Sequence, residues 1–245
     1  NSLPFAIAIG THLPVGVGYA WGLGLDDEDA VVTMMMGDGQ LSTGEAQASM
    51  NWAGVVDAPA VFFCLNNQYA ISVPFSKQTA ANSVAQKALA WGLDGIRVDG
   101  NDVLAVVDAM RRARKRALEG TPVVVEAVTY RIEAHTTNDD PSRYRDDSEV
   151  DWWRERDPFD RYREFLKSEG IWSDIDEEAM EAEIDERFDE AWEEVQAFES
   201  GGVEELFEYV YDEMTPELEA QLDDLKQVLE ERPDVYEYIE ERPKG

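Results

Sequence analysis

The sequence has little of several features that define other classes of protein. Cys64 is its only cysteine, so no disulfide can form within the chain and nothing indicates an oxidising compartment. No apolar run reaches the about 18 to 20 residues that a membrane-spanning helix requires. Basic residues are few: 21 Lys and Arg face 53 Asp and Glu, giving a formal net charge of −32. So acidic a surface repels nucleic acid and anionic membranes, and neither is expected as a partner.

The excess of acidic residues indicates the environment of the protein rather than a binding site. Most of it should form a solvated face, whose self-repulsion is screened in concentrated salt, where the Debye length falls to about 3 Å. The chain has 7 Trp, 9 Tyr and 9 Phe, which argues against disorder. We therefore expect a folded protein from the cytoplasm of a halophile.

Four short apolar runs alternate with helix-length segments in the first part of the chain. The runs are typical of strands buried on both faces of a sheet and lie at residues 30–36, 60–65, 95–98 and 122–129. Helices are predicted at 45–56, 84–91 and 102–119, the last beginning with an Asp cap and ending in basic residues. This alternation predicts an α/β fold with a mainly parallel sheet and helices on both faces.

The later part of the chain is acidic and predicts a C-terminal helical annex that packs on the first domain. Its helices are expected at 157–169, 175–198, 203–211 and 216–231. The spacing of Phe188, Trp192 and Val195 is typical of the buried stripe of an amphipathic helix, with a binding helix as the alternative. We expect two domains, residues 1–150 and 151–245.

Two polar motifs follow predicted strands directly. Asp38, Gly39 and Gln40 come after the first strand, and Asn66 and Asn67 come after the second. Parallel sheets bind ligands beyond the carboxyl ends of their strands. Carboxylate and amide oxygens suit Mg²⁺ or Ca²⁺, and glycine lets the backbone approach a phosphate. Gly-Asp-Gly alone would indicate only a tight turn, whereas the pair predicts a diphosphate site bridged by a divalent metal.

The chain has only two histidines. His135 lies in a polar loop after the last predicted strand, where it can hold or donate protons near neutral pH; a surface histidine without a role is the alternative. His12 lies at the start of a predicted helix, and a structural role is favoured for it.

Five stretches together resemble the alpha subunit of the thiamine diphosphate-dependent 2-oxo acid dehydrogenases. These subunits belong to the decarboxylating component of the pyruvate, branched-chain and acetoin complexes. The resemblance runs from about residue 3 to at least residue 225. The matching stretches are 11–20 (THLPVGVGYA), 44–53 (GEAQASMNWA), 66–74 (NNQYAISVP), 98–105 (VDGNDVLA) and 126–145 (EAVTYRIEAHTTNDDPSRYR).

The resemblance implies a thiamine diphosphate-binding fold and a role for each matching residue. Asp38 and Asn67 match the side-chain ligands of Mg²⁺, and the backbone carbonyl of Tyr69 matches a third ligand. Gly39 and Gln40 match the positions whose backbone meets the diphosphate.

Two further positions and one loop complete the implied site. Ile9 matches the apolar residue that props the cofactor in its bent conformation, and His135 matches the active-site histidine, which we expect to bind cofactor and supply protons. A loop that orders on cofactor binding and receives the lipoyl domain is matched by Arg131, Asp140, Arg143, Tyr144 and Arg145. A salt-bridged loop without a catalytic part is the alternative for this last set.

The implied reaction is oxidative decarboxylation of pyruvate or a branched-chain 2-oxo acid, with transfer of the acyl group to a lipoyl domain of the acyltransferase component. Family members act as α2β2 heterotetramers, in which a glutamate of the beta subunit activates the cofactor at the interface. Two alternatives stay open: an acetoin dehydrogenase alpha subunit, and a truncated chain that serves only as an assembly partner.

Several positions depart from the family pattern. Leu65 stands where branched-chain members carry an arginine, Ala134 replaces a histidine, and Thr136 replaces the serine that is phosphorylated in mitochondrial members. The chain opens at Asn1 in an apolar segment, without the family's N-terminal Tyr-Arg pair for the diphosphate. We therefore expect it to be N-terminally incomplete.

Overall fold

A computed structural model of the chain describes residues 8–198 and 202–232. Contacts between residues divide it into two units, residues 1–173 and 174–245. The predicted domain boundary after residue 150 stays a prediction, as does the packing of the annex on the first domain.

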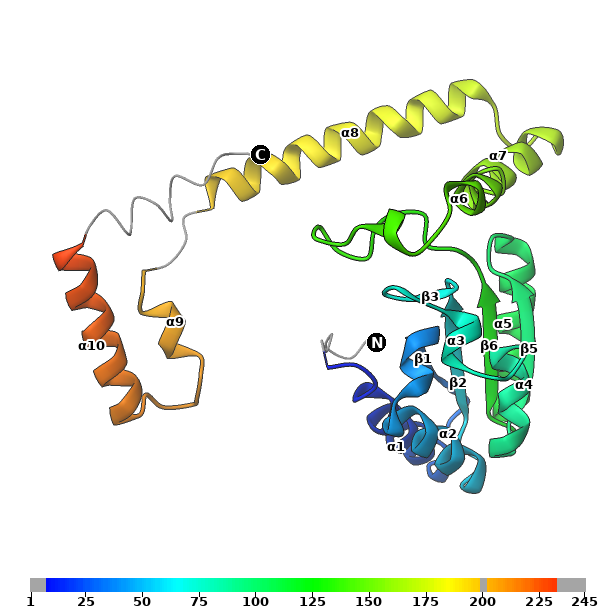
Figure 1. Cartoon of the computed structure of the whole chain (residues 1–245), viewed down its shortest axis with the longest axis horizontal. Coiled ribbons are helices and arrows are strands. Elements are labelled where there is room, and N and C mark those ends of the chain that lie inside the picture. The colour runs from blue at the N-terminus through cyan, green and yellow to red at the C-terminus, as the bar shows by residue number, and fades with distance from the viewer. Residues whose placement is uncertain (1–7, 199–201, 233–245) are drawn as a thin grey trace. The chain divides into compact units, whose positions relative to one another are not determined.

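The first unit is built on a four-stranded parallel sheet in the order β1-β2-β6-β5 (Figure 1). Its strands are β1 (Val32–Gly37), β2 (Ala60–Asn66), β5 (Asp94–Asp99) and β6 (Val123–Val128). All four predicted strands, and the α/β fold, are confirmed. In the register Gly37 is level with Leu65, and Asn66 with Val128, so the carboxyl ends of three strands lie at one edge.

Helices cover both faces of this sheet (Figure 1). On one face Leu13, Met50 and Val84 pack in a core with Phe62 of β2. On the other, alanines four residues apart, such as Ala109, let a helix lie close to the strands. The first face carries α1 (His12–Leu25), α2 (Gly44–Val55), α4 (Val84–Lys87) and the 3₁₀ helix η2 (Ala88–Trp91), and the second carries α5 (Val103–Leu118).

Local signals set the ends of α5 as predicted. The Asp102 side chain accepts a hydrogen bond from the Ala105 N–H at 3.0 Å, and Gly120 follows the helix with φ at +85°. The single helix predicted at 84–91 is instead divided into α4 and η2. Its tighter second part brings the Trp91 carbonyl against Gly54 of α2, where a Cβ atom would lie only 2.2 Å from that oxygen.

Short elements fill the loops of the first unit. Only α7 among them was predicted, at 157–169, and its N-cap Asp157 accepts from the Phe159 N–H at 2.8 Å. The short elements of these loops are η1 (Asp38–Ser42), β3 (Tyr69–Ala70), β4 (Val73–Pro74), α3 (Phe75–Gln78), η3 (Pro141–Arg143), α6 (Asp147–Arg154) and α7 (Pro158–Ser168).

The second unit contains α8 (Asp174–Ala197), α9 (Glu205–Glu208) and α10 (Pro216–Glu231). The helices predicted at 175–198 and 216–231 are confirmed, whereas the one predicted at 203–211 is only four residues long. Aromatic and β-branched side chains at 209–211 favour helix weakly. Glu204 forms an ion pair with Lys226 of α10 at 2.7 Å.

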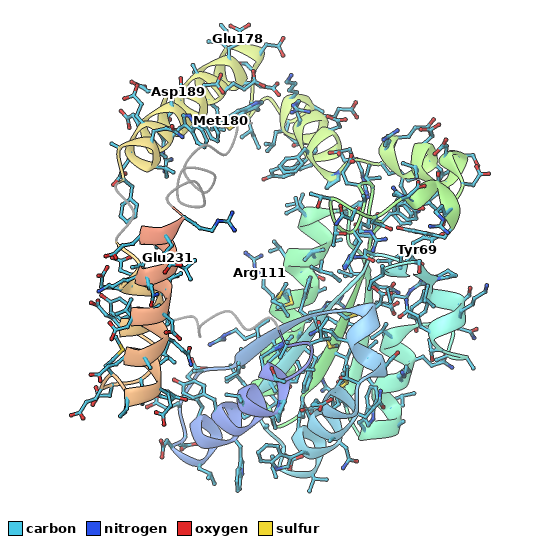
Figure 2. All side chains as sticks on the ribbon, turned by 60° about the vertical axis from the view of Figure 1, so that its left-hand side comes forward. Tyr69, Arg111, Glu178, Met180, Asp189 and Glu231 are labelled. Atoms are coloured by element: carbon cyan, nitrogen blue, oxygen red, sulfur yellow. The ribbon has the colours of Figure 1, made fainter. Side chains whose placement is uncertain are left out.

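The stripe predicted to be buried on α8 is exposed. Phe188, Trp192 and Val195 are 67%, 50% and 63% exposed, because no described element of their own unit covers them. Side chains such as Met180 and Asp189 project from this helix as shown in Figure 2. In the described part of the chain, no helix combines the length and apolar character that crossing a membrane requires.

Replacing Phe62 with alanine is expected to lower the free energy of unfolding by about 3–5 kcal/mol, because the ring is completely buried in the core. Urea denaturation of the whole chain, followed by circular dichroism, measures this change. The matched control is Phe159→Ala at a position 78% exposed, expected to change the free energy by less than about 0.5 kcal/mol. Equal effects of the two substitutions would contradict the assignment of this core.

Candidate functional site

The loops after β1, β2 and β6 meet at the carboxyl edge of the sheet. Asp38 begins η1 immediately after β1, and Asn67 follows β2. The chain after β6 is held against the second loop, because the N–H groups of Thr129 and Arg131 donate to the carbonyls of Asn66 and Asn67 at 3.0 and 3.3 Å. Figure 2 labels Tyr69, which lies at this edge.

Asp38 is a buried carboxylate, with only 2% of its surface exposed. Gln78 Nε2 donates to its Oδ2 at 2.6 Å, and the backbone of Asn67 also donates a hydrogen bond to it. Burial raises the pKa of Asp38 above its ordinary value of 3.8, although these hydrogen bonds and the charge of Arg131 act in the opposite direction. A desolvated carboxylate of this kind is stabilised by a bound cation.

Asn67 and Tyr69 supply the other oxygens of the predicted metal site. Asn67 Oδ1 accepts a hydrogen bond from the Tyr69 N–H at 3.2 Å, and Tyr69 is 7% exposed. The Tyr69 carbonyl accepts from Arg131 Nη1 at 3.3 Å, a long hydrogen bond. Within the described residues no group of three His, Cys, Asp or Glu side chains converges, so a metal here would rest on this mixed set of oxygens.

Gly39 and Gln40 form the turn that presents Asp38. A Cβ atom at Gly39 would lie 2.8 Å from the Cβ of Ala70, so only glycine lets η1 approach the β3–β4 hairpin this closely. Gln40 Oε1 accepts from the Gly37 N–H at 2.7 Å, so its side chain closes the turn. The contact of both backbones with a diphosphate stays a prediction.

Ile9, the predicted cofactor-propping residue, is 64% exposed. The adjacent Gly10 has φ at +85°, and a Cβ atom there would lie 2.9 Å from Thr43 Oγ1, in the loop that leads into α2. His12 Nε2 forms a 2.9 Å hydrogen bond with the Met35 carbonyl, which ties α1 to β1 in the structural role favoured for this histidine.

His135 is exposed and belongs to a network that reaches the loop after β2. Its backbone N–H donates to Asp139 Oδ2 at 2.8 Å, and the Tyr144 hydroxyl donates to the same oxygen at 2.6 Å. Arg131 Nη2 in turn donates to that hydroxyl at 3.0 Å and to the Ile71 carbonyl at 2.6 Å. Ile71 has a φ of +54°, an unfavourable value for a β-branched residue, which this hydrogen bond stabilises.

The structure brings together only part of the predicted lipoyl-binding set. Arg145 donates to the carbonyls of Arg131 and Ile132 and so belongs to the same network. Asp140 instead caps η3 by accepting from Ser142, and Arg143 is exposed within η3.

Two polar residues at this edge were not assigned a role from the sequence. Gln78 lies 40 positions from Asp38, and no pattern in the sequence links the two. Its Oε1 is buried without a hydrogen-bond partner. Glu126 is the one charged residue in the apolar run 122–129, a signal that would have identified it.

A separate cavity of about 430 Å³ lies beside the carboxyl ends of β5 and β6 and contains none of the predicted site residues. Its arginines already have carboxylate partners: Arg97 lies 3.8 Å from Glu126, Arg156 lies 3.6 Å from Glu155, and Arg161 lies 2.9 Å from Asp99. These pairs leave little positive charge for an anionic ligand.

Comparisons with known proteins identify similar sequences. The model of the family described as "Dehydrogenase E1 component" matches residues 2–202. The chain is 45% identical to the 3-methyl-2-oxobutanoate dehydrogenase subunit alpha of Mycobacterium tuberculosis over 224 residues, which is 91% of this chain and 61% of that protein. It is 38% identical to mitochondrial 2-oxoisovalerate dehydrogenase alpha subunits of Arabidopsis thaliana and Homo sapiens, covering 96% and 91% of this chain and half of each relative.

Acidification is expected to release the His135 loop below pH 3.8. Hydrogen bonds from Tyr144 and His135 lower the pKa of Asp139 below its ordinary 3.8, so these contacts stabilise the fold above that value and are lost as the pH falls through the lowered pKa. The amide shift of His135, followed by NMR from pH 7 to 2, measures this transition. Asp139→Asn should abolish it and Glu133→Gln should not; a transition above 3.8 would contradict the assignment.

Proposed function

Because this chain belongs to the dehydrogenase E1 component family, we propose that it is the alpha subunit of a thiamine diphosphate-dependent 2-oxo acid dehydrogenase. The observation that carries the proposal is the meeting of Asp38, Asn67 and Tyr69 at the carboxyl edge of the sheet. The chain spans 61% of its Mycobacterium tuberculosis relative and half of the plant and human ones, so the activity is inferred from part of their length.

The residues present fit thiamine diphosphate bound through a divalent cation such as Mg²⁺. The desolvated Asp38 carboxylate, the Asn67 amide and the Tyr69 carbonyl are hard oxygen donors of the kind that Mg²⁺ prefers. They would leave coordination positions for diphosphate oxygens. Gly39 provides a backbone surface without a side chain, and Ile9 offers an exposed apolar side chain.

When bound, thiamine diphosphate supplies the carbanion chemistry that decarboxylates 2-oxo acids. The chain contributes position and protons. Asp38 and Asn67 hold the cation, while the network from Arg131 through Tyr144 to Asp139 sets the position of the His135 backbone. The exposed His135 can hold or deliver a proton as the acyl group passes to a lipoyl arm.

Branched-chain 2-oxo acids are the substrates that we propose. The relatives described above are named for 3-methyl-2-oxobutanoate and 2-oxoisovalerate, which favours this class over pyruvate and over an acetoin-cleaving enzyme. A chain that serves only in assembly is the second candidate, supported by Leu65 where branched-chain members are expected to carry arginine. Metal-dependent binding of the cofactor distinguishes the two.

The proposed partners are a beta subunit, in an α2β2 heterotetramer, and the lipoyl domain of an acyltransferase. We also propose a cytoplasmic setting rich in salt. The single cysteine and the net charge of −32 support this setting.

Asp38→Asn is expected to abolish Mg²⁺-dependent binding of thiamine diphosphate, because the amide removes the only charged ligand from the cation. The loss of affinity should exceed the about 10–100-fold typical of residues that merely support a metal ligand. This affinity is measured by calorimetric titration of thiamine diphosphate, with Mg²⁺ present, into the whole chain together with its matched beta subunit. Asp57→Asn, an exposed aspartate beyond the opposite edge of the sheet, is the matched control. Retained binding in Asp38→Asn would refute the proposed metal site.

His135→Ala is expected to slow acylation of a lipoyl domain by about 10²–10⁴-fold, the usual contribution of a positioned proton donor. The assay combines the chain with its beta subunit and a lipoyl domain. Asn138→Ala, in the same exposed loop, should keep full activity. Full activity in His135→Ala would show that this histidine carries no proton in the reaction.

A further inference from the structure

Glu126 is a fully buried acid in the middle of a sheet. It lies in β6 between Val125 and Ala127, and none of its surface is exposed. Burying an isolated carboxylate is strongly unfavourable, and such groups are found where hydrogen bonds and charges compensate them. The reaction proposed above does not use this acid.

Two hydrogen-bond donors and one arginine lie around the Glu126 carboxylate. Asn66 Nδ2 donates to Oε1 at 2.7 Å, and the Ala85 N–H, in the first turn of α4, donates to Oε2 at 3.0 Å. Arg97 Nε lies 3.8 Å from Oε2, but the arginine side chain is 59% exposed. Glu126 is level with Cys64 of β2, and alternation along that strand places Asn66 on the same face of the sheet.

The carboxylate fixes which way the Asn66 amide faces. Both Glu126 oxygens accept hydrogen bonds from N–H donors, so Asn66 turns its NH₂ group toward Glu126 and its Oδ1 away from it. That Oδ1 accepts from the backbone N–H of Gln68 at 3.2 Å and from Gln68 Nε2 at 3.1 Å. If the Asn66 amide were reversed, its NH₂ group would face the backbone N–H of Gln68, and two donors would meet without an acceptor.

Gln68 is the residue at which the loop after β2 turns. Its φ is +74°, a left-handed conformation that costs a residue with a side chain about 1–3 kcal/mol and persists only where the surroundings enforce it. The two hydrogen bonds to Asn66 Oδ1 are part of that enforcement. Asn67 and Tyr69, which carry the proposed ligand oxygens, lie immediately on either side.

We propose that Glu126 is a positioning residue for the cation site, acting through the Asn66 amide to hold the turn at Gln68. The inference rests on the proposed function for the identity of the ligands, but the hydrogen bonds do not depend on it. Glu126 touches neither the cation nor the substrate in this scheme. Its contribution is to pre-set the spacing between the Asn67 amide oxygen and the Tyr69 carbonyl.

Glu126→Gln keeps the shape of the side chain and removes one acceptor. The new NH₂ group would face either Asn66 or the Ala85 N–H, so one donor must lose its partner. We expect about tenfold or greater weakening of Mn²⁺ binding measured with thiamine diphosphate present, within the about 10–100-fold range for residues that support metal ligands. Amide hydrogen exchange over residues 66–70 of the whole chain should also become at least about tenfold faster.

An exchanged pair distinguishes positioning from simple support of the fold. In Glu126→Gln/Asn66→Asp the Gln NH₂ can donate to one oxygen of the Asp while the other still accepts from Gln68, so the hydrogen-bond pattern and total charge are restored. This double variant should recover most of the slow exchange and of the Mn²⁺ affinity. Asp94→Asn, at the start of β5 and paired with Arg116, is the matched control and should change neither quantity.

The outcomes separate the two proposals. Unchanged exchange over residues 66–70 and unchanged Mn²⁺ affinity in Glu126→Gln would overturn the positioning role. So would a general loss of thermal stability that the double variant does not reverse. If the parent chain binds no Mn²⁺ even with its matched beta subunit and thiamine diphosphate present, the proposed function fails, and hydrogen exchange alone still decides the role of Glu126.

Discussion

Parallel pairing between neighbouring strands is the constraint on which the rest of this structure depends. When all four strands run the same way, every connection must cross to the far end of the sheet, and every strand delivers its following loop to the same edge. Asp38 and Asn67 therefore meet although a helix and a strand separate them in the sequence. The same constraint brings Arg131, after β6, to the Tyr69 carbonyl.

Two buried carboxylates, at or near this edge, differ in how their hydrogen-bonding needs are met. Glu126 has both oxygens occupied by hydrogen-bond donors and is satisfied within the fold. Asp38 receives its side-chain hydrogen bond from a neutral amide, and burial raises its pKa. The first arrangement suits a fixed internal support, whereas the second leaves a demand for positive charge that an incoming cation can meet.

The sheet and most of the candidate site could be predicted from the sequence because their signals are local. Short apolar runs predict the strands, and the motif residues follow these runs directly in the sequence. The partners of Asp38 and Asn66 could not be found in this way. Gln78 reaches Asp38 through a hairpin and a one-turn helix that have no periodicity, and Glu126 meets Asn66 only once the strand register is known. The prediction of a single helix at 84–91 failed because tertiary contacts decide the structure there. The prediction at 203–211 failed because weak helix formers at 209–211 end that segment early.

The opposite edge of the same sheet carries none of the loops that build the site. There the turn before β2 and the turn before β6 lie next to each other, with Asp57 at φ +50° and Gly120 at φ +85°. A Cβ atom on Gly120 would be 4.0 Å from that of Asp57. Exposed turns of this kind tolerate insertion better than any other part of a domain. This is accordingly the place to attach a fluorophore, an affinity handle or a surface tether while the loops of the candidate site remain undisturbed.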